Sequence, residues 1–152
     1  AAALAAFTPA QRLKCVVYGD SMVGKSCLIK RYCEGKFVAK YLATIGIDYG
    51  VRAVTRPGGG KAVDVRVNFF DLSGADAYAE IRNEFYKDAQ AVALCFAVDS
   101  RDSFDHCDAW LREAAANKVG AVPTVLVGTK TDSRRVVSAE EAARWADARK
   151  LK

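Results

Sequence analysis

The chain has 152 residues, of which 51% are hydrophobic and 27% are charged, which is typical of one soluble globular domain with a buried core. The formal net charge is +5, but Lys and Arg are spread along the chain, so we expect no nucleic-acid partner. No run is long and apolar enough to suggest a membrane span or anchor, and the apolar start at 1–7 lacks the basic residues of a signal peptide. We expect a monomer.

The five cysteines are scattered and form no C-x-x-C pair, so the sequence does not predict a zinc site. Most lie in apolar periodic segments, where a free thiol behaves as a small hydrophobic group. They favour a reduced, cytoplasmic compartment. The cysteines are Cys15, Cys27, Cys33, Cys95 and Cys107.

The first half of the chain predicts a strand, a helix and a hairpin. The segment 13–18 is short, apolar and β-branched and stops at Gly19, which predicts a buried strand before a helix over 25–33. Strands over 47–55 and 63–71 flank Pro57-Gly58-Gly59-Gly60, a turn sequence, so the two predict a β-hairpin.

The second half alternates helices and strands. Helices are predicted over 77–87, 102–117 and 138–150, and strands over 91–98 and 123–127. The last helix opens on Ser138 and Glu141, the spacing of a capping box. The alternation predicts an α/β fold with a mostly parallel sheet, helices on both faces and ligands at the carboxyl ends of the strands.

A phosphate-binding loop is the strongest motif. The pattern G-x-x-x-x-G-K-[ST] is complete in Gly19, Asp20, Ser21, Met22, Val23, Gly24, Lys25 and Ser26. Backbone N–H groups of such a loop surround phosphate oxygens, Lys25 reaches the β- and γ-phosphates and Ser26 binds Mg²⁺. The N–H of Cys27 is expected near the α-phosphate. A chance Gly-rich turn is the alternative, which the flanking strand and helix disfavour.

Two further motifs indicate which nucleotide binds. Asp71-Leu72-Ser73-Gly74 has the form D-x-x-G, so Asp71 can hold Mg²⁺ and the N–H of Gly74 can meet a γ-phosphate. Thr129-Lys130-Thr131-Asp132 follows a strand, and the carboxylate of Asp132 can accept two hydrogen bonds from guanine, beside which the Lys130 stem packs. Taken alone, a D-x-x-G sequence is usually an ordinary turn, and the segment 129–132 is equally compatible with a charged loop tip.

The three motifs in this order resemble the Ras superfamily of small GTPases, and most closely its Rab branch. The resemblance implies a P-loop NTPase three-layer sandwich, a Ras-like G domain that binds GTP or GDP with Mg²⁺. Tyr41-Leu42-Ala43-Thr44-Ile45-Gly46-Ile47-Asp48 is similar to the first Rab switch. By that likeness Thr44 coordinates Mg²⁺, Phe37 packs on the guanine, and loops 37–48 and 72–88 meet effectors and regulators.

Segments 65–71 and 81–88 look more specific, because they are similar to the RJL group, Rab-like proteins that in some lineages carry a J domain. No H-P-D signature of a J domain occurs within the 152 residues.

The sequence departs from the family pattern at three places. Ala75 stands where a Gln usually positions the attacking water, and Asp76 follows it, so we expect slow hydrolysis of GTP to GDP and phosphate. Thr129 replaces the usual Asn of the base motif, and a contact to the base or the phosphate loop is expected to weaken. Lys152 comes before the last strand, base-backing loop and helix of a G domain, so 1–152 is expected to be a single, C-terminally incomplete G domain.

Three functions remain open from the sequence. They are a nucleotide switch with weak intrinsic hydrolysis, a GTPase whose catalytic groups come from an activating partner, and an interaction module that no longer cycles. A P-loop ATPase or nucleoside kinase fits less well, because Asp132 favours guanine. His106 is expected on a helix surface, and Trp110 and Trp145 in helix packing.

Overall fold

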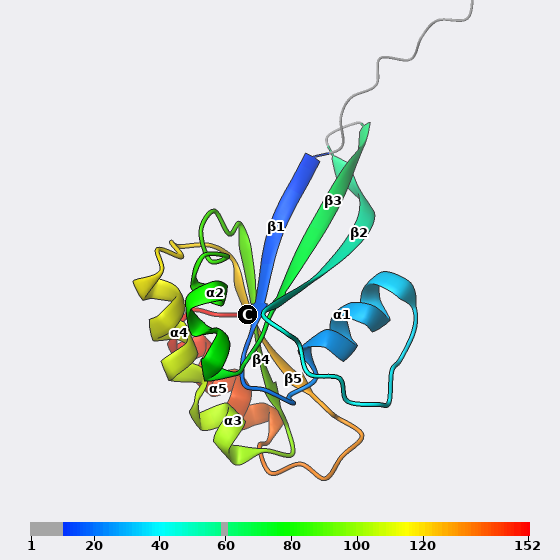
Figure 1. Cartoon of the computed structure of the whole chain (residues 1–152). Helices are drawn as coiled ribbons and strands as arrows, with labels where there is room; N and C mark the ends of the chain where they lie inside the picture. The colour runs from blue at the N-terminus through cyan, green and yellow to red at the C-terminus, as the bar shows by residue number, and fades with distance from the viewer. Residues whose placement is uncertain (1–10, 59–60) are drawn as a thin grey trace, which may run out of the picture.

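The computed structural model describes residues 11–58 and 61–152 and has a five-stranded sheet between two helical layers (Figure 1). The strand order is β2-β3-β1-β4-β5. Helix α1 lies on one face and α2 to α5 lie on the other. This confirms the predicted three-layer α/β fold.

The elements follow the predicted order. The strands are β1 Gln11–Tyr18, β2 Ile47–Gly58, β3 Lys61–Leu72, β4 Ala91–Ala97 and β5 Thr124–Thr129. The helices are α1 Lys25–Glu34, the 3₁₀ turn η1 Asp76–Tyr78, α2 Ala79–Asn83, α3 Arg101–Asp105, α4 Cys107–Ala116 and α5 Ala139–Ala148.

The pairing of the strands brings the motifs to one edge of the sheet. Strand β1 pairs in parallel with β3 and β4, and β4 pairs in parallel with β5. The carboxyl ends of these four strands therefore lie together, and those of β1, β3 and β5 lead into the three motifs that the sequence singles out. Strands β2 and β3 form the predicted antiparallel hairpin.

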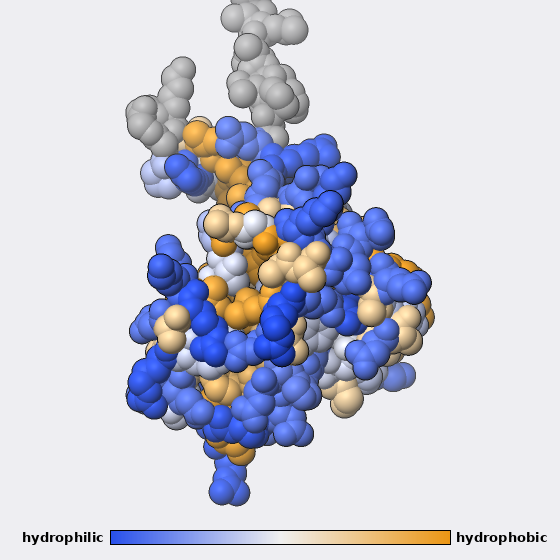
Figure 2. Space-filling model, turned by 90° about the vertical axis from the view of Figure 1, so that its left-hand side faces the viewer, coloured by the Kyte–Doolittle hydropathy of each residue, from blue (hydrophilic) through white to orange (hydrophobic). Residues whose placement is uncertain are grey.

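Each face of the sheet has its own core. Toward α4 and α5, buried side chains of β1 and β4 such as Val16, Leu94 and Phe96 pack with Phe104 and Trp110. Toward α1 the core is made of smaller residues, among them Cys15, Ala93 and Cys95. All five cysteines are free thiols. The face that carries α2 to α5 is mainly hydrophilic outside, with hydrophobic groups in its centre (Figure 2).

The hairpin differs from its prediction in length. Strand β2 continues through Pro57 and Gly58, where the sequence predicts the start of a turn. The proline is tolerated because β2 is an edge strand, so its missing N–H removes no bond that the sheet requires. The rest of the predicted turn, Gly59 and Gly60, lies outside the described residues.

The predicted helix over 77–87 is wrong in extent, because only η1 and the short α2 form there. Phe85 and Tyr86 both turn into the core, with Tyr86 fully buried, and two adjacent large side chains do not share one face of a helix. Asp88 then adopts a left-handed conformation with φ of 59°, which directs the chain into β4.

The predicted helix over 102–117 is divided at His106 into α3 and α4. There the N–H of Ala109 donates to the carbonyl of His106 at 2.9 Å, a bond of the 3₁₀ type that tightens the turn. The predicted cap of the last helix is confirmed, because the Ser138 hydroxyl accepts a hydrogen bond from the Glu141 N–H at 3.1 Å.

Beside β5, the backbone of Lys152 exchanges hydrogen bonds with Thr124 and Leu126, at 3.0 and 2.6 Å. Within residues 11–58 and 61–152, no helix has the length and apolar character needed to cross a membrane.

Leu94→Ala is expected to lower the free energy of unfolding by about 2–5 kcal/mol, because Leu94 is fully buried in β4 and its loss leaves a cavity. Urea denaturation followed by circular dichroism measures this. The matched control is Leu28→Ala on the exposed side of α1, expected to change stability by no more than about 1 kcal/mol. Equal losses would contradict the assignment of β4 to the core.

Candidate functional site

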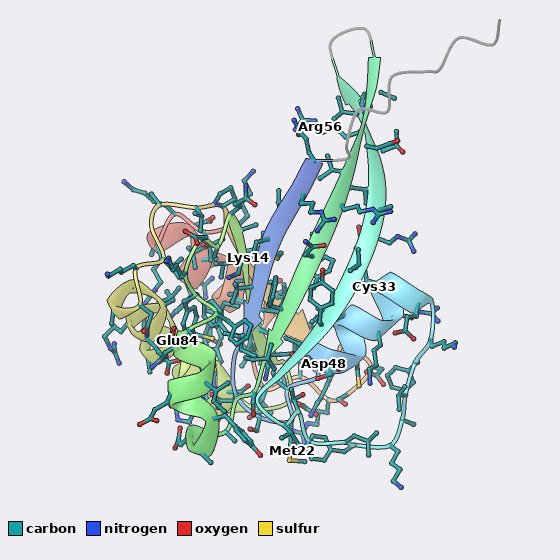
Figure 3. All side chains as sticks on the ribbon, turned by 45° about the horizontal axis from the view of Figure 1, so that its top comes forward. Lys14, Met22, Cys33, Asp48, Arg56 and Glu84 are labelled. Carbon is teal, nitrogen blue, oxygen red and sulfur yellow. The ribbon has the colours of Figure 1, made fainter. Side chains whose placement is uncertain are left out.

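The loop between β1 and α1 is built on three left-handed residues. Gly19, Met22 and Gly24 have φ of 141°, 65° and 99°. A Cβ on Gly19 would lie 2.1 Å from the carbonyl oxygen of Cys95, so only glycine allows the loop to pack this closely on β4. Figure 3 shows Met22 at the end of the molecule opposite Arg56 of the hairpin. The loop thus lies at the carboxyl edge of the sheet.

The ammonium group of Lys25 is held inside this loop. Its Nζ donates to the carbonyl oxygens of Gly19 and Asp20 at 2.9 and 2.7 Å, and the residue is only 6% exposed. Burial lowers the pKa of Lys25, and the nearby carboxylate of Asp71 opposes that shift. A buried ammonium group, which has three donors and no acceptor, is suited to an anionic oxygen ligand.

Ser26, Thr44 and Asp71 meet from three separate segments. The Ser26 hydroxyl donates to Oδ2 of Asp71, and Ser26 Oγ lies 2.9 Å from Thr44 Oγ1. Asp71 is 1% exposed, and burial raises its pKa, while the hydrogen bond from Ser26 and the charge of Lys25 lower it. Its Oδ1 is buried and has no hydrogen-bond partner in the described part of the chain.

That cluster fits a divalent cation such as Mg²⁺. A hard cation prefers oxygen ligands, and the cluster offers two hydroxyls and a carboxylate with an unsatisfied oxygen. A buried polar atom without a partner is costly, and a bound cation would remove that cost.

Gly74 lies directly on the phosphate-binding loop. A Cβ on Gly74 would lie 2.3 Å from the backbone nitrogen of Ser21 and 2.6 Å from the Gly19 carbonyl oxygen, so no other residue fits without movement. Ala75 follows, half-buried, and Asp76 is exposed. Neither Ala75 nor Gly74 carries a side-chain group that can orient a water molecule.

The base motif begins at the end of β5. Thr129 Oγ1 lies within hydrogen-bond distance of the Val23 carbonyl and 3.0 Å from that of Phe96, and its one proton can be donated to either. The hydroxyl therefore keeps a contact to the phosphate-binding loop. Lys130 is left-handed, with φ of 57°, and its side chain and that of Asp132 are exposed.

Two predicted site residues are connected with the loop 37–48: Phe37 belongs to it, and Cys27 of α1 contacts it. Phe37 is 71% exposed, and the structure gives it no packed position. The Cys27 thiol donates to the carbonyl of Val38 at 3.5 Å, which ties α1 to the loop 37–48. The structure thus brings together the phosphate loop, Thr44, Asp71, Gly74 and Thr129, and leaves Phe37, Lys130 and Asp132 exposed around them.

The sequence did not reveal what holds Asp20. Its Oδ1 accepts from Trp110 Nε1 and its Oδ2 contacts His106 Nδ1, both at 2.6 Å. His106 is exposed, as expected, but it reaches the phosphate loop, and its hydrogen bond with Asp20 raises the pKa of its imidazole. Trp110 does pack, against Tyr18, and also donates. The partners are 86 and 90 residues apart in the sequence, so no local pattern predicts either contact.

Comparisons with known proteins agree with this geometry. A family model described as "Ras family" matches residues 14–152. Proteins named "DnaJ homolog subfamily C member 27" are similar to the chain: that of Danio rerio is 46% identical over 146 residues, which cover 91% of this chain and 52% of the relative. That of Rattus norvegicus is 43% identical over 145 residues, with the same coverage.

The relative of the same name from Bos taurus is 53% identical over a shorter stretch of 102 residues, which cover 67% of this chain and 36% of the relative. The chain spans about half the length of the first two relatives. From the family match over nearly all of its length, the chain belongs to the Ras family of small GTPases.

Proposed function

We propose that this chain is a Rab-like small GTPase of the RJL type, a cytoplasmic monomer that binds GTP or GDP with Mg²⁺ and hydrolyses GTP slowly. The observation that carries the proposal is the cluster of Ser26, Thr44 and Asp71 beside the buried Lys25, with one Asp71 oxygen unsatisfied. The similarity to DnaJ homologs supports the RJL assignment, because that group includes Rab-like proteins with a J domain.

Each segment of the site has a part in the proposed binding. Lys25 and the loop N–H groups hold the β- and γ-phosphates, and Gly74 adds its N–H to the γ-phosphate. Ser26, Thr44 and Asp71 hold Mg²⁺, which neutralises phosphate charge. Asp132 accepts hydrogen bonds from the guanine, flanked by Lys130 and Phe37. Thr129 braces the phosphate loop through the Val23 carbonyl.

The same loops offer a surface to protein partners. Thr44 is the residue of the loop 37–48 that senses a γ-phosphate through Mg²⁺, so nucleotide exchange would reorder that loop. Ile45, Tyr49, Val51 and Ile81 are exposed hydrophobic residues on or beside the loops 37–48 and 72–88. Such residues are suited to an effector whose binding depends on the order of the loops.

Two alternatives remain for the chemistry. Ala75 favours weak intrinsic hydrolysis, but an activating partner can supply the missing groups in trans. A module that binds nucleotide without cycling would keep the same site. Single-turnover hydrolysis, with and without a cell extract that contains activating proteins, separates these possibilities.

Asp132→Asn is expected to weaken GDP binding by about 100-fold or more, because the amide removes the charge and replaces one of the two acceptor oxygens with a donor. Xanthosine diphosphate, which has an oxygen in place of the guanine amine, should bind the variant better than GDP does. Fluorescence titration measures both. Asp147→Asn, an exposed position on α5, is the control and should leave GDP affinity unchanged. Unchanged GDP binding by Asp132→Asn would contradict the guanine contact.

Removal of Mg²⁺ with EDTA is expected to speed GDP release about tenfold or more from the native protein, because a cation held by Asp71 and Ser26 would neutralise phosphate charge. In Asp71→Asn the acceleration should be much smaller, since the variant has lost the charge that holds the cation. Stopped-flow release of a fluorescent GDP measures both rates. Release that EDTA leaves unchanged in the native protein would contradict the proposed cation site.

Ala75→Gln is expected to raise the single-turnover rate of GTP hydrolysis by about tenfold or more, because the amide can orient the attacking water. Ala77→Gln places the same side chain at an exposed position two residues farther on and should leave the rate unchanged. Equal rates for the native protein and Ala75→Gln would show that Ala75 does not limit hydrolysis.

A further inference from the structure

Arg82 in α2 is a buried cation that has no part in the proposed nucleotide binding. The residue is 3% exposed, although a guanidinium group is costly to bury unless charged or polar partners satisfy it. Its partners come from two directions. One set belongs to α4, which lies beside α2 (Figure 1), and the other belongs to the D-x-x-G loop.

Helix α4 provides the anchor for the guanidinium group. Arg82 Nε and Nη2 donate to the two carboxylate oxygens of Glu113 at 2.7 and 2.9 Å, and the group lies 4.8 Å from the ring centre of Trp110. Tyr86 donates to the same carboxylate at 2.9 Å. The hydrogen bonds that Arg82 donates to Glu113 raise the pKa of Arg82, so it stays charged. This paired, stacked arrangement fixes the orientation of the guanidinium plane.

The remaining nitrogen reaches the loop that would meet the γ-phosphate. Arg82 Nη1 donates to the carbonyl oxygens of Ser73 at 3.3 Å and Ala75 at 2.7 Å, the residues on either side of Gly74. The Ser73 carbonyl and the Gly74 N–H belong to one planar trans peptide, in which they point in opposite directions. Holding the carbonyl toward Arg82 therefore directs the Gly74 N–H away from Arg82.

Gly74 also packs directly against the phosphate loop, because an added Cβ there would meet the backbone of Asp20 and Ser21. The same helix α4 also holds that loop, through the hydrogen bond from Trp110 to Asp20. One helix thus fixes the phosphate loop and the D-x-x-G loop relative to each other.

This inference rests on the proposed function. We propose that Arg82 is a positioning residue for the γ-phosphate. Anchored to α4, Arg82 holds the carbonyls of Ser73 and Ala75 and thereby orients the Gly74 N–H. The contacts are made within the chain, so ordering this loop does not add to the cost of binding the γ-phosphate. Arg82 therefore contributes to affinity for GTP and not to affinity for GDP, which lacks that phosphate.

The test compares dissociation constants of GDP and a non-hydrolysable GTP analogue, both with Mg²⁺. Arg82→Ala is expected to weaken binding of the GTP analogue about tenfold, on the scale of one hydrogen bond to a charged group. Binding of GDP is expected to weaken by less than about twofold. Equal weakening of both nucleotides, or of neither, would overturn the proposal. If the native protein binds neither nucleotide, the proposed function fails first, which is a distinct result.

Arg149→Ala is a matched control. Arg149 also makes a two-pronged pair, with Asp108 at 2.7 and 2.8 Å, and lies over a tryptophan, Trp145, at 3.9 Å. Its partners are on α4 and α5, away from Gly74, so its loss should not change the ratio of the two dissociation constants. A change in that ratio as large as that of Arg82→Ala would also overturn the proposal.

Glu113→Gln tests the same proposal if Arg82→Ala does not fold. The substitution keeps the size of the side chain but removes the charge that anchors Arg82, so a selective loss of about threefold for the GTP analogue is expected. Circular dichroism establishes that each variant is folded. No selective loss in a folded Glu113→Gln, where Arg82→Ala is unfolded, would overturn the proposal.

Discussion

The parallel pairing of β1 with β3 is the constraint on which the site depends. Val17 lies opposite Asp71 in this register, so the phosphate loop and the D-x-x-G loop leave the sheet side by side. Gly74 then packs on the backbone of Ser21, and Ser26 reaches Asp71 from the first turn of α1. A shift of one residue would turn the Asp71 side chain to the opposite face of the sheet and separate these groups.

Charge balance inside the site follows from this geometry. Lys25 and Asp71 are both buried, and each lowers the cost of burying the other. Asp20 brings a further negative charge into a loop suited to phosphates, and Trp110 and His106 occupy both of its oxygens. Because α4 also holds Arg82 through Glu113, this helix supports both loops of the site.

The sequence predicted the parts of the site that depend on local patterns. The phosphate loop, Asp71 and the base motif each follow a recognisable strand, so their meeting at one edge could be inferred from the order of the elements. The contacts of Asp20 with α4 and of Arg82 with Glu113 join residues 31 to 90 positions apart, and no periodicity marks them. The helix over 77–87 was overestimated because burial of Phe85 and Tyr86 outweighs helix propensity.

The central claim is that the site selects a guanine nucleotide. The most direct measurement is the competition of GDP and ADP, each with Mg²⁺, for the purified protein loaded with a fluorescent GDP. The proposed function predicts that GDP displaces the probe at stoichiometric concentration, and that ADP at a 100-fold excess (about the discrimination that two hydrogen bonds to a carboxylate provide) does not. Displacement by GDP and ADP at equal concentrations would contradict it.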